Sequence, residues 1–485
     1  MKKILFPLTA FLFLFVSCNS DDDGIENGET PDPTSNDVTV QNFMWQAMNL
    51  WYFWQAEVPN LADDRFSSDE EYTEFLASTP DPEQFYEQLQ FSEDRFSFFN
   101  EDFSTLVNGL NGISRSNGLE FGLVRFADSD DVFGYVQYII PNSNASTVDI
   151  QRGDIFTRVD GQVLNVSNFR GLLFGENTTY TLGLATIENN TITDTDEEVT
   201  LTKEEGLVEN PIFLSSTLNV NGQQIGYLMY NAFNRNFNDE LNEVFGQFVA
   251  DGVTDLILDF RYNGGGSVNT SRLLASMISG NSTNDLYIRQ RWNDKIQAQL
   301  SAEQLEDYFA NQVDGTPLNA VGLNRVFVLT TGRTASASEL VMNGLDPYIE
   351  VIQIGETTSG KNEFSITLVD DSENSFIYNS SREDQINPDN SWALQPLVGR
   401  NENADGFSDY TAGFTPDILL EEDLANLGVL GDENEPLLAR ALQEITGETG
   451  KRDFSVQMPA KAMANSKMLS PFKDKMFLDK PISFK

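Results

Sequence analysis

The 485-residue sequence contains no histidine and only one cysteine, Cys18. The lack of histidine excludes a Ser–His–Asp or Cys–His mechanism within the chain, and also any histidine-ligated metal. A single cysteine excludes intrachain disulfides and multi-thiolate metal sites. A hydrolase with a nucleophilic mechanism would therefore need lysine, aspartate, glutamate or a carboxylate-held metal water as its general base.

Positive charge is also scarce, with 30 basic against 75 acidic residues and a formal net charge of -45. Such a field repels nucleic acids and anionic membrane surfaces, so we expect no nucleic-acid partner. The hydrophobic share of 40% and the aromatic share of 11% are typical of a globular chain. No apolar run after residue 38 is long enough to cross a bilayer.

The N-terminal residues have the pattern of a processing segment. Two lysines precede the apolar run Ile4–Val16, and small residues then lead to Cys18. This resembles a bacterial lipobox, with residues 1–17 as the signal peptide and residues 18–38 as an acidic tether; the alternative is an ordinary secretory signal. The acidic residues after Cys18 resemble the export signal of Bacteroidetes-type surface lipoproteins. We therefore expect lipidation at Cys18 and a lipid-anchored protein of the cell envelope, at the outer membrane of a Gram-negative bacterium, facing the periplasm or the cell surface.

The rest of the chain divides by its hydrophobic patterns. A 3.6-residue period from Val40 predicts a helical domain, with further helices at 69–77 and 82–89. Short alternating strands follow, then strands alternating with helices, which indicate an α/β sheet with helical crossovers. Residues 451–485 carry eight Lys or Arg against three Asp. This segment is expected to lack a core of its own and either to lie along the body by charge attraction or to be disordered. The predicted regions are 39–108 (helical), 112–204 (β), 208–446 (α/β core) and 447–485 (basic tail).

The candidate chemistry lies in the stretch 325–361, which reads as strand, turn, helix, strand and turn. Ser336 lies where the first strand gives way to the helix, and Lys361 follows the second strand, so both can meet at one sheet edge. A lysine shielded by apolar neighbours has a lowered pKa and can accept the serine proton as a neutral amine. The alternative for Ser336 is a capping box with Glu339. The turn 264–266 follows a buried strand, where glycine lets backbone approach a substrate carbonyl.

The β region closely resembles a PDZ domain. The likeness rests on a strand at 119–124, a second at 132–140, a proline, and the segment RGDIFTRVDG at 152–161. PDZ domains bind an extended peptide along a sheet edge and hold its terminal carboxylate on backbone N–H groups. By this resemblance Phe121, Gly122 and Leu123 form the carboxylate-binding loop; the alternative is a plain strand entry.

From about residue 40 to 445 the chain resembles the carboxyl-terminal-processing, or tail-specific, serine peptidases. The matching segments are DRFS (94–97), the PDZ stretch, LILDFRYNGGG, TASASE, GETTSGK and GFTPD (413–417). The resemblance implies an α+β multidomain chain whose α/β core is of crotonase and Clp-protease type, with no cofactor. It implies Ser336 as nucleophile, Lys361 as base, and the N–H groups of Ala337 and of Gly264 or Gly265 as oxyanion hole. Its substrates would be polypeptides with free C-termini.

The sequence departs from that family just after the lysine. The position that often holds a lysine-orienting glutamine is Ser365, and Asn362 replaces a glycine. Ser365 is therefore the candidate third catalytic residue, and a rival hypothesis is a catalytically weak or inactive peptide-binding lipoprotein. The segment 401–406 echoes a calcium loop but lacks its last glutamate, which favours an Asx-rich loop. The acidic run 194–198 is predicted to be a solvated hairpin tip.

Overall fold

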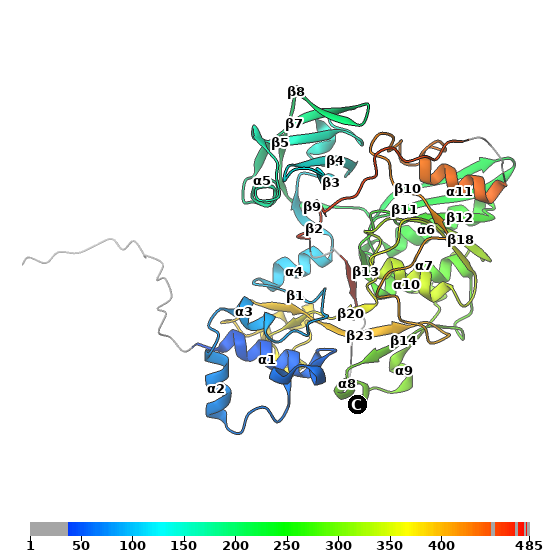
Figure 1. Cartoon of the computed structure of the whole chain (residues 1–485). Coiled ribbons are helices and arrows are strands. Elements are labelled where there is room, and N and C mark those ends of the chain that lie inside the picture. Colours follow the sequence, from blue (N-terminus) through cyan, green and yellow to red (C-terminus); the bar gives the residue numbers. More distant parts are fainter. Residues whose placement is uncertain (1–36, 448–451, 471–473, 480–481, 483–485) are drawn as a thin grey trace, which may run out of the picture. The chain divides into compact units, whose positions relative to one another are not determined.

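The computed structural model describes residues 37–447, 452–470, 474–479 and 482 (Figure 1). The chain divides into two units, 1–37 and 38–485, and the account below concerns the second. The predicted signal peptide, Cys18 and the tether up to residue 36 lie outside the described residues. Within the described ranges, no helix combines the length and apolarity needed to cross a membrane.

The N-terminal part is helical, as the 3.6-residue period predicts. Ser68 caps α2 by accepting a hydrogen bond from the N–H of Glu71 at 3.2 Å. The third predicted helix, 82–89, ends at Glu87, two residues earlier than predicted. Buried aromatic residues of α1 share one hydrophobic core with the α/β part of the chain, and Trp51 donates to the carbonyl of Ser375 at 2.7 Å. The elements are α1 (Thr39–Trp51), α2 (Asp69–Ala77), α3 (Pro82–Glu87), β1 (Phe98–Asn100) and α4 (Phe103–Leu110).

The next region is a sheet with its own hydrophobic core, in the order β25-β3-β4-β5-β7-β8, with β6 paired to β5. An Asp-Gly turn joins β5 and β6, with Asp160 and Gly161 both at positive φ. Strand β25 comes from the far C-terminal part of the sequence. The elements are β2 (Ile113–Ser116), β3 (Leu119–Arg125), β4 (Val132–Ile139), β5 (Ile155–Val159), β6 (Gln162–Val163), α5 (Phe169–Phe174), β7 (Thr179–Glu188), β8 (Thr191–Thr202), β9 (Glu204–Val208) and β25 (Ala464–Asn465).

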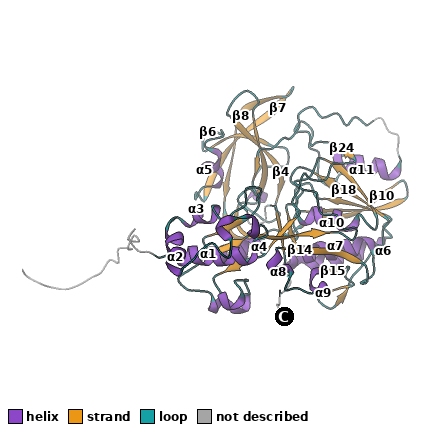
Figure 2. Ribbon diagram, turned by 60° about the horizontal axis from the view of Figure 1, so that its bottom comes forward, coloured by secondary structure: helices purple, strands orange, loops and turns teal. Residues whose placement is uncertain are grey.

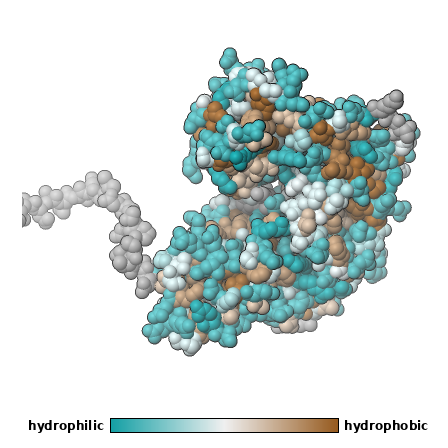
Figure 3. Space-filling view, in the orientation of Figure 1, coloured by the Kyte–Doolittle hydropathy of each residue, from teal (hydrophilic) through white to brown (hydrophobic). Residues whose placement is uncertain are grey.

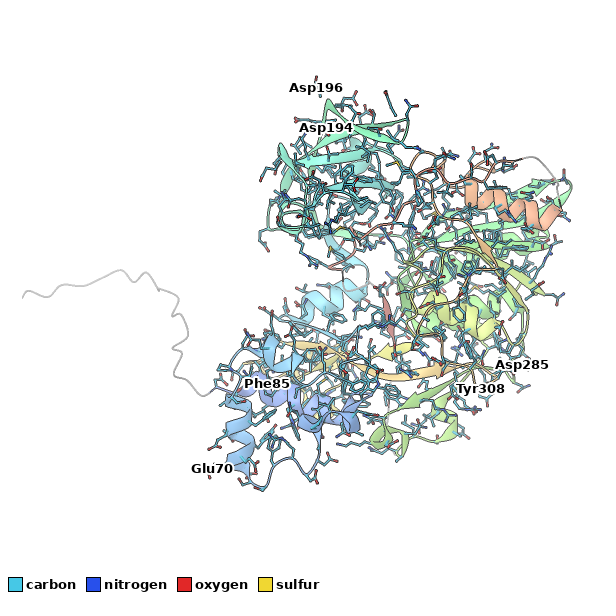
Figure 4. The ribbon with its side chains drawn as sticks, in the orientation of Figure 1. Glu70, Phe85, Asp194, Asp196, Asp285 and Tyr308 are labelled. Carbon is cyan, nitrogen blue, oxygen red and sulfur yellow. The ribbon has the colours of Figure 1, made fainter. Side chains whose placement is uncertain are left out.

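The acidic run 194–198 is not a hairpin tip, which corrects that expectation. The β7–β8 turn is formed by Asn189 and Asn190, both at positive φ, which asparagine tolerates. The acidic residues follow along β8, where Asp194 pairs with Arg158 at 2.6 Å and Asp196 is exposed. Figure 4 shows Asp194 and Asp196 at the outer part of this hairpin.

The main α/β sheet has the order β10-β11-β12-β18-β19-β24 and is parallel from β11 onward. Residues that alternate along these strands pack into two different hydrophobic cores, one on each face of the sheet. Leu258 and Val328 pack toward α6, α7 and α10, while Ile257 and Phe327 pack toward α11, so helices cover both faces (Figures 1 and 2). The elements are β10 (Ile212–Val220), β11 (Gln223–Tyr230), α6 (Asn238–Asp251), β12 (Asp255–Asp259), α7 (Val268–Ser279), β18 (Arg325–Thr330), α10 (Ala337–Leu345), β19 (Glu350–Gly355), β24 (Ile418–Leu419) and α11 (Pro436–Thr446).

A second six-stranded sheet has the order β13-β26-β20-β23-β14-β15. Its strand β13 begins within the glycine turn 264–266, and β20 begins two residues after Lys361. Its elements are β13 (Gly265–Ser267), β14 (Leu286–Trp292), β15 (Glu306–Tyr308), β20 (Glu363–Ser365), β23 (Leu397–Glu402) and β26 (Lys475–Phe477). Smaller elements are α8 (Asp294–Gln297), α9 (Ala302–Leu305), β16 (Gln312–Val313), β17 (Thr316–Pro317), β21 (Leu368–Val369) and β22 (Ala393–Gln395).

The visible surface is mostly hydrophilic, as the acidic composition leads one to expect. Figure 3 shows one larger hydrophobic area, over α11 and the neighbouring strands β10–β12. The acidic residues Glu70 on α2 and Asp285 before β14 lie at the periphery in Figure 4. The buried polar groups instead concentrate around the ends of β12, β18 and β19.

Candidate active site

Ser336 lies in the turn between β18 and α10, as predicted, and its backbone conformation is unusual. Its φ of +66° and ψ of -115° place a non-glycine residue in a region that costs about 1–3 kcal/mol. The residue is fully buried, and its Oγ has no hydrogen-bond partner among the described residues. The capping-box alternative is present as well, because the N–H of Ser336 donates to the carboxylate of Glu339 at 2.7 Å at the start of α10.

Two threonines of the preceding loop fix this turn against the end of β12. Thr334 Oγ1 donates to the carbonyl of Phe260 at 2.8 Å, and Thr331 Oγ1 donates to the carbonyl of Arg261. The N–H of Ala335 donates to the carbonyl of Asn263 at 3.1 Å. The turn that contains Ser336 and the glycine turn are therefore held together by hydrogen bonds made along both loops.

Glu339 binds the backbone of both candidate catalytic residues, a role that the sequence analysis did not assign to it. Its carboxylate accepts hydrogen bonds from the N–H groups of Ser336 (2.7 Å), Gly360 (2.7 Å) and Lys361 (2.9 Å), and from Thr358 Oγ1 (2.6 Å). Burial raises the pKa of this carboxyl to about 7, while the hydrogen bonds act in the opposite direction. The only sequence signal was Ser-x-x-Glu, which reads as a local cap.

Lys361 is fully buried, and burial lowers the pKa of its amine to about 8, against the attraction of nearby carboxylates. The ring of Phe96 lies 5.1 Å from Nζ. Its neighbour Arg95 donates to the carbonyl of Gly360 at 2.6 Å, and Asp94 accepts the N–H groups of Phe96 and Ser97. The DRFS segment thus lies directly against the lysine loop, although it is 265 residues away in sequence.

The amine of Lys361 does not bond to Ser336 in this structure. Nζ donates to the backbone carbonyl of Asp474 at 2.5 Å, and Asp474 belongs to the C-terminal tail. The two residues are nevertheless joined through Glu339, which accepts the N–H of each. The serine and the lysine follow the adjacent parallel strands β18 and β19, as the sequence predicts.

The glycine turn lies against the serine. At Gly265, with φ +106°, an added Cβ would lie 2.6 Å from Ser336 Cβ and 2.9 Å from the N of Ala337. The N–H of Gly265 donates to Asn263 Oδ1 at 2.8 Å. The backbone of 264–265 and the first N–H of α10 therefore surround the same small space next to Ser336.

Ser365 has other partners than the lysine. Its Oγ donates to the carbonyl of Met476 at 3.1 Å and accepts from Gln395 Nε2 at 2.9 Å. Asn362 Nδ2 donates to the carbonyl of Ser408, and its Oδ1 has no partner among the described residues. Gln395, a further residue that the sequence analysis missed, is buried next to Ser365, and no local pattern distinguishes it.

The predicted peptide-binding residues Phe121, Gly122 and Leu123 lie within β3, on the edge opposite β4. A Cβ at Gly122 would lie 2.4 Å from the ring of Tyr135, so glycine is needed for close packing there. A cavity of about 540 Å³ extends from this region toward Gly264. It is lined among others by Glu120, Asn231, Arg333, Lys467 and Asp474.

The segment 401–406 forms an Asx turn, in which Asn403 Oδ1 accepts the N–H groups of Asp405 and Phe407. Asn401 instead donates to the sulfur of Met476 at 3.0 Å. Over the described ranges, no cluster of three His, Cys, Asp or Glu side chains could hold a metal ion.

Comparisons with known proteins match this architecture. Residues 224–401, which include Ser336 and Lys361, match the sequence model of Peptidase family S41, and residues 39–98 match that of the Peptidase S41 N-terminal domain. A C-terminal processing peptidase from the chloroplast of Tetradesmus obliquus is 27% identical over 256 residues, 49% of each chain. Carboxyl-terminal-processing peptidase 2 of Arabidopsis thaliana is 26% identical over 279 residues, 56% of this chain and 50% of the relative.

A solved structure extends the likeness to most of the chain. A candidate S41 protease of Bacteroides fragilis NCTC 9343 aligns with a TM-score of 0.66 and 26% identity, over 87% of this chain and all of that one. The matched regions span about half the length of the two curated relatives described above. These matches support a serine peptidase, which is a hydrolase, with similarity to peptidase family S41 over residues 39–98 and 224–401 and to C-terminal processing peptidases.

Proposed function

We propose that this protein is a serine endopeptidase with a Ser336–Lys361 catalytic pair, which captures polypeptide C-termini on a PDZ-like sheet and cleaves through an acyl-enzyme. The observation that carries the proposal is the shared carboxylate of Glu339, which binds the backbone of a strained buried serine and of a buried lysine. Two groups so positioned in a dry site suit nucleophilic catalysis.

In the proposed reaction Ser336 Oγ attacks the scissile carbonyl carbon while the neutral amine of Lys361 takes the hydroxyl proton. The N–H groups of Ala337 and Gly264 stabilise the oxyanion; Gly264 is the better candidate of the two glycines, since the N–H of Gly265 donates to Asn263. Lys361 then protonates the leaving amine, and water hydrolyses the acyl-enzyme. Ser365 remains the proposed third residue, which would act on the lysine after a rearrangement of its present hydrogen bonds.

The PDZ-like role rests on the separate core of the sheet and on the side of β3 opposite β4, where Phe121 to Leu123 pair with the short strand β25 and could pair with a peptide in its place. The lipid anchor at Cys18 and the envelope location rest on the sequence alone. A catalytically inactive peptide-binding lipoprotein is the second candidate, favoured by Asn362 Oδ1 beside the lysine, which has no partner in the part of the chain that the structure describes.

Incubation of the mature protein with unstructured peptides that bear free or amidated C-termini tests these proposals. We expect cleavage of the free-ended peptides, and its loss in Ser336→Ala and in Lys361→Ala, while Ser338→Ala serves as a matched serine control. Cleavage that survives both substitutions contradicts the catalytic pair. Binding without cleavage by the unsubstituted protein supports the inactive alternative. Mass spectrometry of the N-terminus tests the anchor, and an unmodified Cys18 contradicts it.

A further inference from the structure

The basic tail does not merely lie along the body, because two of its segments complete sheets of the folded chain. The first, β25, pairs antiparallel with β3, with Ala464 opposite Leu123 and Asn465 opposite Gly122. The N–H of Met463 donates to the carbonyl of Leu123 at 2.8 Å, and the N–H of Ser466 donates to that of Phe121 at 3.0 Å. This is the edge that the sequence analysis assigned to peptide binding.

Side chains reinforce the first contact. Ser466 Oγ donates to Glu120 at 2.5 Å, and Lys467 pairs with Glu209 at 2.7 Å. Both acidic partners are largely buried, so their interactions with the tail are screened less than exposed pairs. A basic segment on a chain of net charge -45 is attracted to such a site.

The second segment, β26, enters the catalytic site as a strand. It pairs parallel with β13, with Lys475 opposite Gly265 and Met476 opposite Gly266, and also with β20. The N–H of Lys475 donates to the carbonyl of Gly264 at 2.9 Å, and the N–H of Leu478 donates to that of Ser365 at 3.0 Å. Met476 is fully buried.

This strand occupies the groups that the proposed mechanism needs. The carbonyl oxygen of Asp474 accepts a hydrogen bond from Lys361 Nζ, so the proposed base is bound to a main-chain oxygen. The carbonyl oxygen of Lys475 lies 2.3 Å from the point where a Cβ on Gly265 would be, next to Ser336 Cβ and the N of Ala337. A substrate strand could not pair with β13 while β26 does so.

We infer that β13, β20 and the side of β3 opposite β4 form a binding surface for an extended polypeptide strand, and that the segments 463–467 and 474–479 of this chain are its resident ligand. A substrate must displace the tail before Lys361 can reach Ser336. This inference rests on the proposed function for its catalytic consequence, but the docking of the tail is independent of catalysis. Release of the tail therefore raises both substrate affinity and turnover.

Binding to the full-length chain tests the inference without any catalytic step. Lys475→Pro removes the N–H that donates to Gly264, and Leu469→Pro places the same residue in the turn after β25, where the native side chain is 59% exposed. Each change is made in the Ser336→Ala background. Amide hydrogen exchange reports the docking, and fluorescence anisotropy reports the affinity for a labelled unstructured peptide with a free C-terminus.

We expect slow exchange at Met463, Ser466 and Lys475 in Ser336→Ala, and faster exchange across 474–479 after Lys475→Pro alone. If the tail is docked in nine molecules of ten, its release lowers the apparent Kd of the peptide about tenfold. A synthetic peptide of residues 463–479 should compete with the labelled peptide on the Lys475→Pro variant.

Equal peptide affinity in the Lys475→Pro and Leu469→Pro chains overturns the inference, as does fast exchange at Lys475 in the starting protein. The parallel cleavage assay with Ser336 intact keeps the two proposals apart. A change in affinity without cleavage by any variant contradicts the peptidase and leaves the tail as the resident ligand.

Discussion

If Lys361 is the proposed base, its buried amine should make activity depend on pH in a defined direction. Its pKa of about 8 means that the amine is mostly charged at pH 6 and mostly neutral at pH 9. Because only the neutral amine accepts the serine proton, kcat/KM should rise about tenfold per pH unit at low pH and level off above about pH 8. Initial rates of peptide cleavage between pH 5.5 and 9.5 measure this profile.

Lys361→Arg provides the matched test, since an arginine stays charged at every pH in this range and should lower the rate about 100- to 10,000-fold. Lys461→Ala, which changes an exposed lysine of the tail, should keep the profile. A rate that stays constant between pH 6 and 9 speaks against a lysine base.

In the proposed mechanism, Glu339 acts through the backbone of Ser336 and Lys361, which it binds. Glu339→Gln replaces one acceptor oxygen by a donor that faces N–H groups, so at least one buried donor loses its partner, at about 1–3 kcal/mol of unfolding free energy. We expect kcat to fall while KM for the peptide changes little, because Ser336 and Lys361 lose their alignment. Thr358→Val removes only one of the four hydrogen bonds and should give a smaller fall.

Denaturant unfolding and steady-state kinetics on the same preparations separate the two effects. If Glu339→Gln lost stability and kept kcat, the carboxylate would be a structural cap and nothing more. The pH profile of kcat/KM for Glu339→Gln is a further measurement, because the loss of a purely structural cap would leave that profile unchanged.

At this scale the sequence could indicate Ser336 and Lys361, because both follow strands that are readable as apolar runs. It could not assign the role of Glu339, since a cap within one turn and a bond to a residue 22 positions away have the same local pattern. The roles of Arg95 and Gln395 depend on contacts across 265 and 30 residues, which no local rule reports.

At the scale of elements, β13 is a three-residue strand that exists only because glycine permits it. Gly265→Ala would place a methyl group within 2.3 Å of the Lys475 carbonyl oxygen, at a φ of +106° that alanine rarely adopts. We expect a loss of a few kcal/mol of unfolding free energy and of most activity, since Ser336 is also in contact. Thermal unfolding and peptide cleavage measure the two effects.

Gly315→Ala is the control, because that glycine also has positive φ, at +86°, but an added Cβ would meet no atom within 4 Å. The Gly315→Ala chain should lose about 1 kcal/mol of unfolding free energy, which is the cost of the positive φ for alanine alone. Similar losses in both variants would mean that the close approach to Ser336 and the tail has no energetic role.

The element that the sequence predicted best is a capped helix. Helix α2 has the predicted bounds 69–77, because capping is local. Strands β20, β25 and β26 could not be predicted, because each has at most three residues and forms only by pairing with a distant segment.

At the scale of the whole molecule, a buried ionic network joins the sheet that contains β3–β8 to the end of β12. Glu422 accepts from Arg152 (2.8 Å), Tyr262 (2.7 Å) and Arg261 (3.3 Å), and Arg261 also pairs with Asp259 and Glu435. Arg152 comes from the turn before β5, whereas Tyr262 lies just before the glycine turn. The network therefore connects the sheet of the proposed peptide-binding region with the loop of the proposed oxyanion hole.

This network should make unfolding sensitive to acid. Burial by itself raises the pKa of Glu422, but Arg152 and Arg261 more than offset that and lower it to about 2 from 4.5. A carboxyl with a depressed folded-state pKa stabilises the protein above pH 4.5, and its contribution, about 3 kcal/mol, disappears as pH falls toward 2.

Urea unfolding at several pH values, with Glu422→Gln beside Glu444→Gln, measures this contribution. Glu444 forms a partly exposed i,i+4 pair with Arg440, so its change should alter stability by less than about 1 kcal/mol and keep the acid dependence. The Glu422→Gln chain should be less stable at neutral pH and lose less stability between pH 4.5 and 2; an unchanged slope would mean that Glu422 is not the group that acid protonates.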